Sequence, residues 1–82
     1  MSTNFVTKNI KLSLDFDRYV NRKPDALIKV TKGSWIIFTV KGDSKFNAES
    51  RSLGNKIVTS KKKVIEARKE GSRWTIQSFV VA

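Results

Sequence analysis

The residues best equipped for chemistry in this sequence are its lysines and arginines. They number 17 against seven Asp and Glu, so a chain of 82 residues has a formal charge of +10. The densest cluster consists of Lys56, Lys61, Lys62, Lys63, Arg68 and Lys69. A row of cations gains affinity for nucleic-acid phosphates by releasing counterions, without contacting the bases. Nucleic acid is therefore the first partner to consider.

The spacing of these cations predicts where they would act. On a helix whose apolar stripe contains Phe46, Leu53, Ile57 and Val64, the opposite side carries Arg51, Asn55, Lys62 and Lys69, and one flank carries Lys56 and Lys63. The candidate nucleic-acid-binding residues are Arg51, Lys56, Lys61, Lys62, Lys63 and Lys69. Because lysine suits phosphate contact better than bidentate reading of guanine, we expect non-specific or weakly specific, salt-dependent binding. The alternative is a solvated helix face whose charge only maintains solubility.

Catalytic chemistry has few residues to use. The sequence contains no cysteine and no histidine, so thiolate nucleophiles, disulfides, zinc sites with Cys or His ligands and the commonest general base are all excluded. We therefore predict a binding protein that is not an enzyme and has no metal or cofactor. A protein-interaction module or antitoxin-like regulator with an acidic protein partner is the alternative to nucleic-acid binding.

Three other features could form sites. Trp35 and Trp74 could stack on bases, but a small sheet needs large side chains in its core, so packing is the preferred interpretation. Asp15 and Asp17 diverge by about 200° on a helix, which predicts surface charges, with Asp15 near Lys11 or Arg18. Residues 42–45 lack the spacing of a phosphate loop, although the helix that follows could hold one anion.

The first predicted element is a long N-terminal segment rich in apolar residues. Ile10, Leu12, Leu14 and Phe16 alternate with polar residues as in a strand, but helical spacing competes. A helical stripe formed by Phe5, Leu12, Phe16, Tyr19 and Val20 continues beyond the alternation, so a helix is favoured. Residues 24–27 resemble the first turn of a short helix.

Two strands and a long helix follow. Trp35–Val40 is an unbroken β-branched and aromatic run, which predicts a strand covered on both faces. From Asp43 or Ser44 to Gly71 the apolar spacing is helical, with Gly71 as a C-cap and Gly54-Asn55 as a weak point. Residues 73–81 predict a second strand.

The predicted fold is a single small basic α/β (α+β) domain over residues 1–82. Its order is helix, short helix, strand, long helix, strand, and the two strands should form a parallel pair. Because a two-stranded sheet is marginal and has open edges, we expect a homodimer that completes it. No signal peptide is evident and no apolar run approaches the roughly 18 to 20 residues that span a bilayer, so we expect a soluble, cytoplasmic protein.

Three segments carry a family resemblance: residues 8–20, Pro24-Asp25 followed by residues 35–38, and residues 67–71 before a terminal strand. They resemble a family of small uncharacterised prokaryotic proteins, a domain of unknown function. The resemblance implies a helix over residues 9–20, a short helix opened by Pro24 and a strand-helix-strand order, but no activity. The sequence departs from that pattern at Lys23, where members have histidine, and in a lysine-rich second helix.

Overall fold

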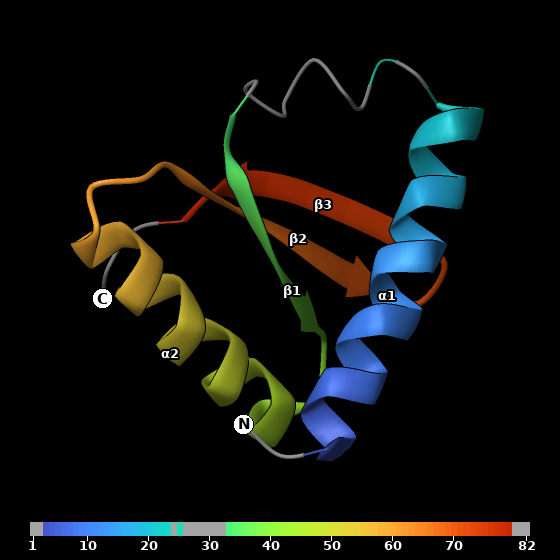
Figure 1. Ribbon diagram of the computed structural model, residues 1–82. Coiled ribbons are helices and arrows are strands. Elements are labelled where there is room, and N and C mark those ends of the chain that lie inside the picture. Colours follow the sequence, from blue (N-terminus) through green and yellow to red (C-terminus); the bar gives the residue numbers. More distant parts are fainter. Residues whose placement is uncertain (1–2, 24, 26–32, 80–82) are drawn as a thin grey trace.

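The computed structural model, which describes residues 3–23, 25 and 33–79, combines two helices with a three-stranded sheet (Figure 1). The elements in chain order are α1 (Thr3–Arg22), β1 (Trp35–Val40), α2 (Ser44–Thr59), β2 (Val64–Glu70) and β3 (Arg73–Ser78). The predicted α+β class is therefore confirmed. The short helix expected at residues 24–27 lies, apart from Asp25, outside the described residues.

Helix α1 settles the choice between helical and strand spacing in the N-terminal segment. Phe5, Leu12, Phe16 and Val20 are buried, and they recur at the spacing of one helical face. Ile10 and Leu14, which contributed to the strand-like alternation, are instead exposed on the flank of this helix. The helix predicted from the apolar stripe is confirmed.

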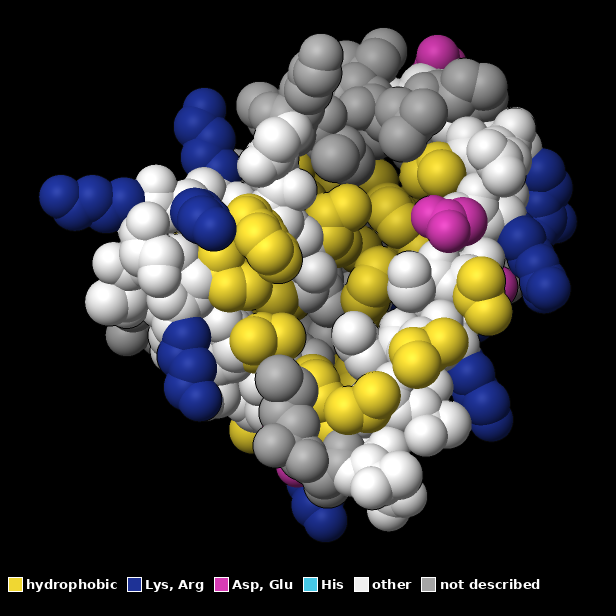
Figure 2. Space-filling view, in the orientation of Figure 1, with side chains coloured by type: hydrophobic (Ala, Val, Ile, Leu, Met, Phe, Trp, Pro, Cys, Tyr) yellow, Lys and Arg dark blue, Asp and Glu magenta, His cyan; other side chains and the backbone are white. Residues whose placement is uncertain are grey.

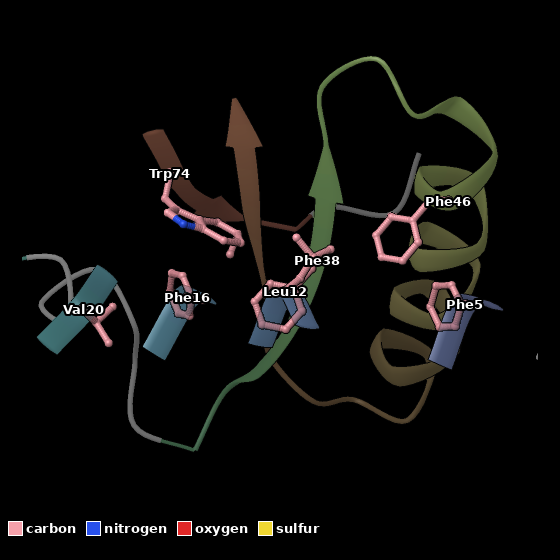
Figure 3. Close-up of a cluster of buried hydrophobic side chains, with 8 residues drawn as sticks. Phe5, Leu12, Phe16, Val20, Phe38, Phe46 and Trp74 are labelled. Carbon is pink, nitrogen blue, oxygen red and sulfur yellow. The ribbon is translucent and has the colours of Figure 1, made fainter. Parts of the chain in front are cut away.

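The core lies between α1 and one face of the sheet (Figure 3). The Phe16 ring makes edge contacts with Phe38 of β1 and Trp74 of β3, at centroid distances of 5.7 and 5.1 Å. Such edge-to-face pairs stabilise the core by about 0.5–1.5 kcal/mol each beyond the area that they bury. Ala67 of β2 is fully buried below this cluster, which leaves no space for a larger side chain.

The sheet has the order β1-β2-β3, with β1 and β2 parallel and β2 and β3 antiparallel. The expected parallel pairing of residues 35–40 with residues 73–81 is wrong, because β2 lies between β1 and β3 and pairs with both. The parallel partner of β1 is β2, and α2 connects these two strands. Ile37, Phe38 and Thr39 are all buried, so the expected burial of both faces holds at the centre of β1.

The predicted long helix from residue 43 or 44 to Gly71 is wrong beyond Thr59. Lys61 has a φ of 63°, a left-handed conformation that ends the helix, and its N–H donates to the Val58 carbonyl at 2.8 Å. Residues 64–70 then form the central strand β2. A strand buried on both faces does not alternate, so its apolar residues at 64, 65 and 67 also fit a helical stripe.

Gly71 belongs to a hairpin and does not cap a helix. Glu70 pairs with Arg73, which leaves Gly71 and Ser72 as a two-residue turn, and the φ of 63° at Gly71 suits such a turn. The terminal strand is therefore the third strand of the sheet and antiparallel to its neighbour. Gly54, expected as the weak point, lies inside a continuous α2.

Candidate nucleic-acid interface

Three of the predicted binding residues lie in the turn between α2 and β2. Lys61, Lys62 and Lys63 are all exposed. The backbone carbonyl of Lys63 accepts a hydrogen bond from the Trp35 N–H at 2.9 Å, which fastens the turn to the start of β1. The lysines are therefore presented from a turn that is hydrogen-bonded to the sheet.

Trp35 stands beside this turn because β1 and β2 are parallel and begin at the same end of the sheet. The side chain is 49% exposed, and the ammonium of Lys62 lies 4.9 Å from the centroid of its ring. The preference for core packing is confirmed for Trp74, which is buried, but it is wrong for Trp35. Ile36 and Phe38 face α1, so alternation along the strand directs the Trp35 side chain to the opposite face of the sheet, which α1 does not cover.

Helix α2 adds two of the predicted cations. Lys56 is exposed in the last helical turn of α2, just before the connection that contains Lys61, Lys62 and Lys63. Arg51 is exposed nearer the start of the same helix. The expected stripe of cations along a single helix is wrong, because α2 ends at Thr59 and Lys62 and Lys69 lie beyond it. We define the lysine end as Lys56, Lys61, Lys62, Lys63 and Trp35.

Lys69 does not belong to the lysine end. It lies six residues after Lys63 along β2, which corresponds to about 20 Å at the rise of an extended strand. Its ammonium forms an ion pair with Asp15 of α1 and lies 5.9 Å from the Trp74 ring centroid. Lys69 therefore joins α1 to the sheet, and Asp15 is paired with it across the fold.

The lysine end has the electrostatics of an anion-binding surface. Its four lysines have no acidic neighbour within the group, and no ion pair of the described residues involves any of them. Their charge is therefore available to an anionic partner. Exposed lysines next to an exposed indole can contact phosphates while the ring stacks on a base.

The N-terminus of α2, considered from the sequence as an anion site, holds a carboxylate of the chain itself. Asp43 is the N-cap, and its side chain accepts a hydrogen bond from the Phe46 N–H at 3.1 Å. Lys8 of α1 forms an ion pair with the same carboxylate. The hydrogen bond from Lys8, followed by that from Phe46, lowers the pKa of Asp43.

The acidic residues are dispersed. Within residues 3–23, 25 and 33–79, no three acidic side chains come together as a possible metal site. Glu66 is the buried acid, and it accepts a hydrogen bond from the Thr39 hydroxyl at 2.7 Å on the face of the sheet opposite Phe38. Neither of the described helices has the length and apolar character needed to cross a membrane.

Sequence reasoning missed the position of Trp35 at the site. The sequence does contain a signal for it, because Gly71-Ser72 suits a hairpin turn and a hairpin makes residues 64–70 a strand. A strand that follows β1 through a helix is expected to be parallel to β1. Two parallel strands start at the same end, so Trp35 and the lysine turn become neighbours once β2 is recognised.

No curated protein and no solved structure matches this chain. A family model described as a family of unknown function (DUF5647) matches residues 4–81, which is nearly the whole chain. The match agrees with the resemblance of residues 8–20, 24–25, 35–38 and 67–71 to an uncharacterised family. This chain therefore belongs to the family of unknown function DUF5647.

Proposed function

We propose that the protein binds single-stranded nucleic acid at the lysine end, with little sequence specificity and with no chemical step. The observation that carries the proposal is the position of Lys62 over the exposed ring of Trp35, within a turn of three consecutive lysines. The expected setting is the cytoplasm, where RNA and single-stranded DNA are accessible.

In the proposed complex the lysines contact the phosphates and the Trp35 ring contacts a base. Lysine ammonium groups neutralise backbone phosphates, and each neutralised phosphate releases counterions. The exposed part of the Trp35 indole stacks on a base, which is worth about 1–3 kcal/mol per base and tolerates any base. A duplex hides its bases, so it would use the lysines alone.

The test compares two triple variants that remove the same charge. Lys61, Lys62 and Lys63 are replaced by alanine in one, and Lys11, Lys41 and Lys45, which are exposed elsewhere, in the other. Binding to labelled oligothymidylate and to a duplex is followed by fluorescence anisotropy at several salt concentrations. For the first variant we expect a salt slope that is shallower by about 2, since each single-strand contact contributes about 0.7.

The control variant should keep most of the affinity and nearly the full salt slope. Equal losses in the two variants would mean that only the total charge matters, which contradicts a site at the lysine end. Absence of binding by the wild type to both oligonucleotides at ~50 mM salt would overturn the proposal. Binding of an acidic polypeptide such as polyglutamate, with neither oligonucleotide bound, would favour a protein partner.

A further inference from the structure

The outer edge of β1 presents backbone groups that the chain leaves unpaired. The Trp35 N–H donates to the Lys63 carbonyl and the Lys41 N–H donates to the Lys69 carbonyl, so odd-numbered residues of β1 point to β2. The backbone groups of Ile36, Phe38 and Val40 consequently point to the opposite, outer edge.

Asn47 of α2 closes one end of this edge. Its side-chain amide accepts from the Val40 N–H and donates to the Val40 carbonyl, both at 2.7 Å. Among the described residues, no hydrogen bond reaches the outward groups of Ile36 and Phe38. The open part of the edge is thus limited to these two residues.

The open edge lies in an apolar groove. The groove has a volume of about 580 Å³ and runs between β1 and α1, with Ile10, Leu14, Trp35, Ile36 and Phe38 in its lining. The hollow between the two helices is largely hydrophobic, while Lys and Arg side chains project around the periphery (Figure 2). An uncharged edge strand in such a groove lacks the lysines and prolines that usually prevent strand pairing.

Helix α1 extends the apolar surface along the groove. Val6, Ile10 and Leu14 follow one another at intervals of four residues on one side of α1, and they are 46%, 55% and 56% exposed. With Trp35, they are the large hydrophobic residues that are exposed in the described part of the chain. Exposed apolar side chains that gather at one edge of a sheet are typical of an interface.

From these features we infer that the outer edge of β1 pairs with β1 of a second copy of this chain. The strands run antiparallel about a two-fold axis at Ile37, and the two sheets join into one of six strands. In this register Ile36 of each copy lies opposite Phe38 of the other. Each exchanges its N–H and C=O with that partner, and the resulting four hydrogen bonds satisfy the open groups of both copies.

The same two-fold axis also brings together the exposed residues on either side of the paired strands. It is perpendicular to the sheet, so both α1 helices lie on one face and their Val6-Ile10-Leu14 lines face each other. Ser34 comes opposite Val40 of the second copy, and its buried hydroxyl is unpartnered among the residues that the structure describes. Because Asn47 already bonds the backbone groups of Val40, the ladder of hydrogen bonds at this edge is short. A short ladder fits pairing with a second β1 better than binding of a long extended peptide.

Charge also favours a second copy over an anionic partner at this groove. Asp17 is the one charged residue among the described residues that line it, although the whole chain has a net charge of +10. The groove therefore has no positive charge that would repel a second copy of this basic chain. The two lysine ends would lie at opposite ends of the joined sheet, where their repulsion is screened by salt.

Sedimentation equilibrium from ~10 µM to ~1 mM tests the interface in the full chain, a range that brackets weak and moderate association. We expect a mass that approaches twice the 9.3 kDa of one chain. Leu14→Lys places two ammonium groups across the axis and should weaken dimerisation by at least about a hundredfold. Ser52→Lys, which adds the same charge at an exposed position of α2, should leave dimerisation unchanged.

Amide hydrogen exchange identifies the surface itself. The Ile36 and Phe38 amides should become protected as the concentration of the wild type rises, and they should exchange quickly in Leu14→Lys. The Ile37 and Thr39 amides, which donate to β2, should stay protected in both proteins. A wild type that stays monomeric at ~1 mM, a dimer unaffected by Leu14→Lys, or edge amides protected equally at every concentration would each overturn the inference.

Discussion

Lys62 holds its ammonium nitrogen 4.9 Å from the centroid of the Trp35 ring, at the end of the sheet where β1 and β2 both begin. The two residues are far apart in the sequence, and the parallel pairing of the strands brings them together. This contact is the geometric reason for expecting charge and stacking to act on the same ligand.

Replacing Trp35 by alanine should therefore weaken binding to single-stranded oligonucleotides by about 1–3 kcal/mol, while the salt slope stays unchanged. The reason is that the lysines remain and only the stacking surface is lost. Fluorescence anisotropy with oligothymidylate and with a duplex measures both effects, and Trp35→Phe serves as the control that keeps an aromatic ring. An equal loss for the duplex would contradict base stacking.

The double hydrogen bond between Asn47 and Val40 should make Asn47 a large contributor to stability. Asn47→Ala leaves two backbone groups of Val40 without their partners, at a cost of about 2–4 kcal/mol. Urea unfolding followed by circular dichroism provides the measurement. Asn55→Ala on the same helix is the matched control, because no described hydrogen bond uses the side-chain oxygen of Asn55, and it should change stability by less than about 0.5 kcal/mol.

Gly54 should be intolerant of alanine although it lies in a helix. A Cβ at this position would be 2.9 Å from the Phe79 ring and 3.1 Å from the Ile37 side chain, which is itself buried. The steric cost should exceed the gain of about 1 kcal/mol in helix propensity and leave Gly54→Ala about 1 kcal/mol less stable than wild type.

The control for Gly54 is Ser52→Ala, at an exposed position of the same helix, which should stabilise the protein by up to about 0.5 kcal/mol. Thermal unfolding of the two variants compares the effects directly. A gain in stability for Gly54→Ala would show that the Phe79 ring and Ile37 move aside at no cost, contrary to the expectation.

Asp43 should make the stability of the junction between α1 and α2 depend on acid pH. Its pKa in the folded protein is lowered from 3.8 by the hydrogen bonds from Lys8 and Phe46, so the unfolded chain takes up a proton first as pH falls. The contribution of this carboxylate is fully present above pH 3.8 and is lost as the pH falls through the folded pKa.

Asp43→Asn keeps a helix-capping side chain and removes the charge. We expect the wild type to melt at a higher temperature than Asp43→Asn near neutral pH, and the difference should shrink below about pH 4. In a Lys8→Ala background the difference should be smaller at every pH. A difference between wild type and Asp43→Asn that grows as the pH falls would have the wrong sign for a carboxylate with a lowered pKa.

Local spacing and residue type are enough to predict several features of this protein. The stripe of Phe5, Leu12, Phe16 and Val20 identifies α1, because burial of one helical face leaves apolar residues at helical spacing. The run from Trp35 to Val40 identifies β1, because a strand covered on both faces is an unbroken series of β-branched and aromatic residues. The net charge of +10 and the absence of cysteine and histidine are likewise properties of composition.

Contacts between distant segments, in contrast, make residues 64–70 a strand and set the environments of Trp35 and Lys69. A central strand needs no alternation, so the choice between helix and strand there depends on β1 and β3 being present to pair with it. That pairing carries Lys69 to Asp15 and places Lys62 over Trp35. It also leaves β1 as an edge, since strand order is a relation among distant segments that local sequence does not encode.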